Sequence, residues 1–322
     1  MIEGKGLCKY YDVKGSRLFQ EKKFIKAVDH LDFCIYPGEV FGLVGESGCG
    51  KSTLGKMLAD VITPTKGEIT FLGNKISEQN SRKNRELIRK IQMVFQDPYS
   101  SLNPKKKIGW MLEEPLKLHT SLSLQERRMK VMEMLKAVGL DSAYAGKYPN
   151  ELSGGQRQRV SIAAALMLDP ELIIADESVS ALDLSIQSQI LNLLKKLQET
   201  KNLTYLFISH DLNVVHYMSD RIGVMYLGQL VEVGTVKDLY HSPAHPYTKA
   251  LLSSMPSVSM EEKRERILLN GDIPNMANPP SGCPFHTRCQ EARPDCQMSC
   301  PELLEIGEKH FVRCHYAGKE GT

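Results

Sequence analysis

The sequence predicts an α/β protein with a mostly parallel β-sheet, and three observations support this class. Between residues 40 and 208, short apolar runs that suit buried strands alternate with longer segments of helical period. A glycine-rich loop joins the first run, Val40–Val44, to a helix-period segment. Several later runs end directly on polar side chains, which are therefore expected at the carboxyl ends of strands, where open α/β sheets bind ligands.

The glycine-rich loop fits the pattern G-x-x-x-x-G-K-[ST] and reads Gly45-Glu46-Ser47-Gly48-Cys49-Gly50-Lys51-Ser52-Thr53. Its glycines let successive backbone N–H groups turn inward around a phosphate, because a Cβ would obstruct that path. Lys51 can place its ammonium between the β- and γ-phosphates of a nucleotide, and the Ser52 hydroxyl can ligate Mg²⁺. The following helix points its positive end at the anion. We therefore predict a nucleotide site on this loop.

Composition excludes several other classes of protein. The 322 residues are 42% hydrophobic and 25% charged, as in ordinary globular proteins, and a net charge of +3 does not indicate nucleic acid binding. No apolar run reaches the roughly 18 residues of a membrane span. The amino terminus lacks the apolar core of a signal peptide. We expect a cytoplasmic chain whose membrane association, if any, depends on partners.

Strand and helix patterns predict two additions to the parallel sheet. Residues 2–8, 25–36 and 67–73 look like strands, and their alternation of apolar and polar residues is typical of half-buried antiparallel sheet. Helical periodicity from about residue 108 to 139 predicts an inserted helical subdomain at about residues 97–158.

Proline content changes after about residue 250, and apolar periodicity weakens there. We therefore expect a nucleotide-binding domain at residues 1–250 and a C-terminal extension at residues 251–322.

Two carboxylates follow the apolar run Leu172–Ala175. Asp176 can hold Mg²⁺, directly or through water. Glu177, one residue later, is suited to polarise a water molecule for attack on a γ-phosphate. Exposed carboxylates at a strand end are common, but a phosphate-binding loop elsewhere in the chain favours the catalytic interpretation.

A second anion site is predicted where Ser153-Gly154-Gly155-Gln156 begins a helix, because this start exposes backbone N–H groups. It lies about a hundred residues from the phosphate-binding loop, so one nucleotide is not expected to use both elements of one subunit. A two-fold dimer allows both elements to contact one nucleotide, since the second anion site of each subunit then lies over the phosphate-binding loop of the other.

Gln96 and His210 also follow predicted strands. The Gln96 amide can touch Mg²⁺ and the attacking water, and it can report γ-phosphate occupancy to the helical insert. The His210 imidazole can donate a hydrogen bond to the γ-phosphate. Neither residue alone would indicate a function. Their position at the carboxyl ends of predicted strands, where open α/β sheets bind ligands, favours a functional role.

Together these residues resemble the ATPase subunits of ABC transporters over roughly residues 2–250. The matching stretches are the Walker A loop at 45–53, the Q-loop at Gln96, the signature motif at 152–156, Walker B with its glutamate at 172–177, the D-loop at 180–183 and the switch histidine at His210. The resemblance implies a P-loop ABC cassette with a mostly parallel sheet, an antiparallel β-subdomain, an inserted helical subdomain and a small Cys-rich extension.

The resemblance also implies individual roles. Glu177, His210 and Lys51 would be catalytic, and Tyr11 would stack on adenine, with Tyr10 as the competing candidate. Magnesium would be held by Ser52, Gln96 and Asp176. The signature residues and the D-loop Asp183 would act on ATP in trans. One departure is Ser178, because the family usually has proline there; it changes backbone stiffness beside the general base.

Three stretches resemble the dipeptide/oligopeptide branch of this family, namely 97–104, 245–248 and 282–289. This implies an ATPase subunit of a peptide importer at the cytoplasmic face of the membrane. Its expected partners are two transmembrane permease subunits, a second ATPase chain or a copy of itself, and indirectly an extracellular solute-binding protein. The same machinery serves nickel and related solutes, so the cargo stays open.

Two further functional classes were weighed. A soluble ABC-type ATPase of repair or translation usually has two cassettes or a long coiled coil, and this chain has one cassette and no heptad run. A nucleotide-sensing module without catalysis would not need Glu177 and His210.

Five of the eight cysteines lie within the last forty residues. A cytosolic chain should not use them for disulfides, so a metal centre is the better expectation. The intervals between Cys283, Cys289, Cys296 and Cys314 are wider than the tight pairs of zinc ribbons. Four thiolates on a proline-rich tail can wrap a [4Fe–4S] cluster, and the resembled branch carries one with this spacing. Zinc and free thiols remain alternatives, and Cys300 can replace Cys296.

Overall fold

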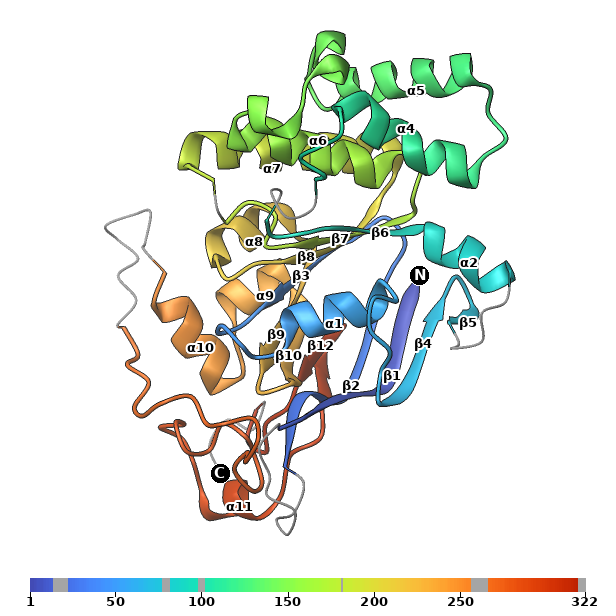
Figure 1. Cartoon of the computed structure of the whole chain (residues 1–322). Helices are drawn as coiled ribbons and strands as arrows, with labels where there is room; N and C mark the ends of the chain where they lie inside the picture. The colour runs from blue at the N-terminus through green and yellow to red at the C-terminus, as the bar shows by residue number, and fades with distance from the viewer. Residues whose placement is uncertain (14–22, 77–81, 98–101, 181, 256–265, 318–322) are drawn as a thin grey trace. The chain divides into compact units, whose positions relative to one another are not determined.

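In the computed structural model the chain forms two compact units (Figure 1). The first comprises Met1–Glu78 and Ile208–Thr322, and the second comprises Gln79–Phe207. The described residues are all except 14–22, 77–81, 98–101, 181, 256–265 and 318–322.

A four-stranded antiparallel sheet in the first unit has the order β2-β1-β4-β5. Its strands are β1 (Ile2–Asp12), β2 (Phe24–Ile35), β4 (Lys66–Phe71) and β5 (Asn74–Ile76). The central strand β1 pairs Ile2 with Ile35 on one side and with Phe71 on the other, and all three side chains are buried. The predicted antiparallel strands are therefore present.

The second set of strands in this unit runs β11-β12-β10-β9-β3. Its members are β3 (Val40–Val44), β9 (Arg221–Tyr226), β10 (Gln229–Thr235), β11 (Leu304–Gly307) and β12 (His310–Val312). The pair β3/β9 is parallel, and the pairs β9/β10, β10/β12 and β11/β12 are antiparallel. The hairpin β9/β10 was not predicted; its turn, Leu227-Gly228, has φ of 41° and 82°, as a type I′ turn requires.

Helices of the first unit include α1, which starts where the glycine-rich loop ends. They are α1 (Lys51–Leu58), α8 (Leu212–Met218), α9 (Val236–His241), α10 (Pro246–Ser253) and α11 (Pro294–Met298). Helix α8 lies against β3 so closely that a Cβ on Gly42 would be 2.5 Å from Val215 Cγ1. This contact fixes the strand that carries the loop.

The C-terminal extension adds β12 to β10, pairing Glu232 with Val312. Both sides of the predicted boundary at residue 250 belong to the first unit. The division into a domain at residues 1–250 and an extension at residues 251–322 stays a prediction.

Glu232 on β10 joins several elements from a fully buried position. Its carboxylate accepts hydrogen bonds from the backbone N–H groups of Ala244 and His245, and His310 Nε2 lies 2.8 Å from Oε1. Burial alone would raise the pKa of Glu232, but these hydrogen bonds outweigh it and lower the pKa.

We expect Glu232→Gln to lower the free energy of unfolding by about 3 kcal/mol, because it leaves the buried donors without their charged acceptor. Since the pKa of Glu232 is lowered by folding, this contribution is complete above the usual glutamate pKa of about 4.3 and is lost at lower pH. Denaturant titration at pH 7 and pH 3 measures it. Exposed Glu302→Gln is the control, and equal stability of both variants at pH 7 would contradict the prediction.

The second unit contains the strands β8-β7-β6 with a group of helices. The strands are β6 (Ile91–Val94), β7 (Leu172–Asp176) and β8 (Thr204–Ile208). Strands β6 and β7 are parallel, with Ile91 opposite Leu172. Strand β6 ends at Val94, and Phe95 is exposed, so Gln96 lies two residues beyond the strand.

Helices of the second unit include α4, α5 and α6, which contact one another. The helical segments are α2 (Arg82–Arg89), α4 (Ile108–His119), α5 (Leu124–Ala137), η1 (Ser142–Gly146), η2 (Pro149–Glu151), α6 (Gly154–Leu166) and α7 (Leu184–Lys201). The helical pattern expected at 108–139 comprises two helices, α4 and α5, because Ser123 and Glu126 form a capping box that starts α5.

No helix within the described residues has the length and apolar character needed to cross a membrane.

Candidate functional site

The glycine-rich loop connects β3, whose five residues are all buried, to α1 in the first unit. Gly50 is the N-cap of α1 with φ of 111°, and a Cβ there would lie 2.0 Å from the Ala27 carbonyl oxygen. Gly48 has φ of 79°, and a Cβ on it would meet nothing within 4 Å. The loop is therefore fixed on one side by backbone contact and open at Gly48. This geometry is the one that phosphate binding requires.

Lys51 lies inside this loop and is only 5% exposed. Its Nζ donates to the carbonyl oxygens of Gly45 at 2.8 Å and Glu46 at 3.0 Å. Cys49 beside it is buried, and burial raises the pKa of its thiol. The loop thus holds a positive charge and a neutral thiol within a few residues.

His210 lies at the same end of β3 as the loop. The backbone N–H of Ser209 donates to the Leu43 carbonyl at 3.3 Å, one residue before the end of β3. Asp211 caps α8 by accepting hydrogen bonds from the backbone N–H groups of Asn213 and Val214. The strand end and the cap together fix the backbone of His210, whose side chain is exposed.

Tyr10 and Tyr11 differ in their surroundings. The Tyr10 hydroxyl donates to Asp29, and burial and this hydrogen bond raise the pKa of Tyr10. Tyr11 is 39% exposed, with the Lys9 ammonium 5.4 Å from its ring centroid. Of the two candidates, Tyr11 offers the accessible ring.

Gln96 and Glu177 lie together in the second unit. Val94 is opposite Ala175 in the parallel pair β6/β7, and Gln96 and Glu177 each stand two positions after this pair. Gln96 Nε2 donates to Glu177 Oε2 at 2.7 Å. Asp176 ends β7 and is 5% exposed. Carboxylate and amide groups thus gather at the carboxyl ends of these strands, as predicted.

Glu177 has a strained backbone with φ of 45°. A turn follows, in which Ser180 donates to the Glu177 carbonyl through its backbone N–H at 3.2 Å and through its hydroxyl at 3.0 Å. Ser178 is buried, and its hydroxyl has no hydrogen-bond partner among the residues that the structure describes. A residue that stands where the resembled family has proline thus leaves a polar group unsatisfied beside Glu177.

The predicted second anion site is the start of α6 in the same unit. Ser153 and Gln156 form a capping box, and the Gln156 amide also donates to the Tyr144 hydroxyl at 2.8 Å. A Cβ on Gly155 would lie 2.5 Å from Ile186 Cγ2, so this glycine permits close packing against α7. Asp183 caps α7 by accepting from the Ile186 N–H. The signature segment and Asp183 are therefore neighbours.

Residues of the C-terminal region contact the phosphate-binding loop, which sequence reasoning missed. Arg288 donates from Nη1 and Nη2 to the two Glu46 carboxylate oxygens at 2.7 and 3.0 Å. The Tyr247 hydroxyl accepts from the backbone N–H of Glu46 at 2.9 Å. These residues belong to stretches 245–248 and 282–289, which the sequence marks only by their resemblance to the dipeptide/oligopeptide branch. A carboxylate within an anion-binding loop was the available signal, because it requires a nearby cation.

Four of the extension's cysteines line one small cavity, with a volume of about 40 Å³. They are the predicted set Cys283, Cys289, Cys296 and Cys314. Burial, and next the neighbouring thiols, raise the pKa of Cys283 to about 12. Cys300 is exposed and does not line the cavity. All eight cysteines of the chain are free.

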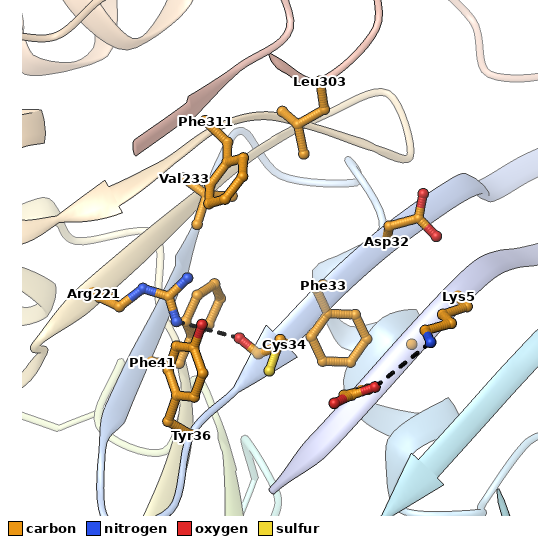
Figure 2. A pocket seen from close by; sticks show the side chains of 12 residues that line it. Lys5, Asp32, Phe33, Cys34, Tyr36, Phe41, Arg221, Val233, Leu303 and Phe311 are labelled. Atoms are coloured by element: carbon orange, nitrogen blue, oxygen red, sulfur yellow. Dashed lines mark hydrogen bonds and ion pairs between the residues drawn. The ribbon is translucent and has the colours of Figure 1, made fainter. Parts of the chain in front are cut away.

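A second cavity of about 540 Å³ lies at the amino ends of β3 and β9, where Phe41 and Arg221 line it. Figure 2 shows the rings of Phe33, Tyr36 and Phe311 around it and the hydrogen bond from Arg221 to the Cys34 carbonyl. The phosphate-binding loop follows the other end of β3. This cavity is therefore separate from the loop and from His210.

A phosphate-binding loop between a buried strand and a helix, with polar groups at the ends of neighbouring strands, defines the class as a P-loop nucleotide-binding protein. A family model described as "ABC transporter" matches residues 28–180, and another, "Oligopeptide/dipeptide transporter, C-terminal region", matches residues 231–296.

Curated relatives narrow the class further. The oligopeptide transport ATP-binding protein AppF of Bacillus subtilis is 53% identical, covering 98% of this chain and 97% of that protein. The dipeptide transport ATP-binding protein DppF of Escherichia coli is 46% identical, covering 98% and 93%. The chain belongs to the oligopeptide/dipeptide family of ABC transporter ATP-binding subunits, and ATP with Mg²⁺ fits such an ATPase.

Solved structures agree with this assignment. The dimeric ATP-binding cassette MJ0796, in a post-hydrolysis state with ADP and Pi, is 32% identical with a TM-score of 0.65, covering 73% of this chain and 99% of that chain. CbiO1 from Clostridium perfringens, part of the transporter complex cbiONQ, is 28% identical with a TM-score of 0.64, covering 75% and 90%. The predicted ABC cassette fold is thereby confirmed.

Proposed function

We propose that this chain is the ATP-hydrolysing subunit of an ABC importer that drives uptake of di- or oligopeptides. Its partners are two transmembrane permeases, a second ATPase subunit or a copy of itself, and indirectly an extracellular solute-binding protein. The chain lies at the cytoplasmic face of the membrane, bound through the permeases. The hydrogen bond from Gln96 to Glu177 carries the catalytic part of the proposal, because it joins two reactive groups at neighbouring strand ends.

The phosphate-binding loop and Tyr11 are assigned to ATP binding. Backbone N–H groups of residues 45–53 surround the phosphates, and Lys51 donates to the β- and γ-phosphates once its ammonium leaves the loop carbonyls. Tyr11 stacks on adenine, which its exposure supports. The magnesium ligands are Ser52, Asp176 and Gln96, a set of hard oxygen donors that suits this ion. Bound Mg²⁺ would neutralise phosphate charge.

Hydrolysis is assigned to Glu177 and His210. The Glu177 carboxylate accepts a proton from the attacking water, and the amide of Gln96 holds that carboxylate in place. The imidazole of His210 donates to the γ-phosphate and stabilises the charge that develops there.

A second cassette completes each site. Residues 153–156 and Asp183 of one subunit act on the nucleotide held by the loop of its partner, since the start of α6 is an anion site of its own. MJ0796 was solved as a dimer, which supports a shared site of this kind.

We test the function with the chain purified together with its permeases and reconstituted in vesicles. Peptide-loaded binding protein is expected to stimulate ATP hydrolysis severalfold, and nickel-loaded or unloaded binding protein is not. Failure of the permeases to co-purify would contradict the transport role, whereas stimulation by nickel alone would reassign the cargo.

We also propose that the thiols of Cys283, Cys289, Cys296 and Cys314 hold a [4Fe–4S] cluster with a structural role. Their shared cavity supports a common ligand. A zinc ion binds four sulfurs at about 2.3 Å, which brings them within about 4 Å of one another. Within the described residues, no three possible ligand groups of the extension lie within 4.8 Å of one another, and this wider spacing supports a cluster rather than zinc. A cluster spaces its thiolates further, because each binds a different iron.

The expected result is about four iron atoms per chain, with visible absorption, after anaerobic purification. Cys289→Ser removes one ligand and is expected to lose most of the iron, whereas the matched variant Cys300→Ser keeps it. Iron analysis and thiol titration measure both. Zinc without iron in wild-type protein would contradict the cluster, and equal iron loss in both variants would contradict the ligand set.

A further inference from the structure

The phosphate-binding loop carries a carboxylate at Glu46, and this carboxylate is an electrostatic problem. Backbone N–H groups and Lys51 make the loop attractive to anions. An unpaired carboxylate on the same loop would repel a triphosphate, because like charges a few ångströms apart interact strongly near a protein surface. Nucleotide binding therefore requires that the charge of Glu46 be neutralised.

Arg288 of the C-terminal extension supplies the neutralising charge. Both of its Nη atoms bond the Glu46 carboxylate, and the two side chains are 7% and 22% exposed. A two-point guanidinium–carboxylate contact fixes orientation as well as charge. Arginine is required here, since the ammonium of lysine cannot form the two parallel hydrogen bonds.

The surroundings of Arg288 keep it at this position. Phe285, three residues earlier, is 1% exposed, and its ring lies 5.3 Å from the rings of both Tyr226 and Tyr247. Tyr247 is fully buried and accepts the backbone N–H of Glu46. The aromatic cluster thus brings the extension to the loop, and both the side chain and the backbone of Glu46 are held.

We propose that Arg288 is a positioning residue for ATP binding, which cancels the charge of Glu46 and orients the phosphate-binding loop from the C-terminal extension. This inference rests on the proposed ATPase function. It gives the extension a role in nucleotide affinity, apart from any metal that its cysteines hold. Arg288 touches Glu46 and not the reacting atoms, so it is expected to change KM for ATP more than kcat.

The test is a charge-rescue series in the full-length chain. Binding of a fluorescent ATP analogue with Mg²⁺ is measured for wild type, Arg288→Gln, and Arg288→Gln combined with Glu46→Gln. We expect Arg288→Gln to weaken binding about tenfold at low salt, and the combined variant to recover most of that loss, because it removes the uncompensated charge of Glu46. The loss in Arg288→Gln should shrink as salt rises.

The matched control is Arg293→Gln, five residues along the same extension. Arg293 is exposed and lies over the ring of Tyr316 at 4.1 Å, without a bond to the loop. The nucleotide affinity of Arg293→Gln should equal that of wild type. Thermal melting of every variant separates lost folding from lost affinity, and if Arg288→Gln does not fold, a folded combined variant with near wild-type affinity still supports the charge argument.

Two results would overturn the positioning role. One is wild-type affinity in Arg288→Gln, and the other is a folded combined variant that binds as weakly as Arg288→Gln alone. If the wild-type chain itself binds no nucleotide, the proposed function fails, which is a distinct outcome.

Discussion

Glu177→Gln is expected to reduce ATP hydrolysis at least a hundredfold while leaving ATP binding intact. General bases contribute about 10²–10⁴-fold to a rate, and an amide cannot accept the proton of the attacking water. The substitution changes neither size nor burial, so the strained backbone at φ of 45° can remain. Because the bound ATP is not hydrolysed, the closed dimer should accumulate.

Steady-state ATPase assays and light scattering with and without ATP measure both effects. The matched control is Glu171→Gln, where the glutamate precedes β7 at its other end and pairs with Lys90 on the surface. That variant should keep wild-type turnover. Wild-type hydrolysis in Glu177→Gln would exclude Glu177 as the base, and a monomer at saturating ATP, with natural partners present, would contradict the shared site.

Local motifs predicted the parts of the site that lie within one segment. The phosphate-binding loop was found because its glycines, lysine and hydroxyl residues follow each other in nine positions, and the fold requires that order. Gln96 and Glu177 were found because each follows an apolar run, and their hydrogen bond then follows from the register of β6 and β7. These predictions were possible because the residues are either close together in the sequence or at matching positions of two paired strands.

Contacts between distant segments were not predictable in the same way. Arg288 and Glu46 are 242 residues apart, and nothing near Arg288 marks it as the partner of a loop. Two features that the sequence analysis did not resolve have local signals: Leu227-Gly228 between apolar runs indicates a hairpin, and Ser123-x-x-Glu126 indicates a helix start.

Lys51→Met should weaken ATP binding about a hundredfold. Two hydrogen bonds from an ammonium to charged phosphates contribute about 3 kcal/mol together, and methionine fills a similar volume without a donor. In the structure Lys51 Nζ donates hydrogen bonds to the carbonyl oxygens of Gly45 and Glu46, so its positive charge lies inside the loop. Removing it therefore affects affinity directly, rather than a step that follows binding.

Equilibrium binding with an ATP analogue measures the loss, and melting temperature checks that the loop still folds. Lys56→Met, one turn further along α1, is the matched control because its side chain belongs to the same helix and is only partly buried. Lys51→Met should also lose hydrolysis in proportion to bound nucleotide, in contrast to Glu177→Gln. If Lys51→Met bound ATP within threefold of wild type, the ammonium would not contact the phosphates, and the nucleotide would have to be held by the backbone N–H groups alone.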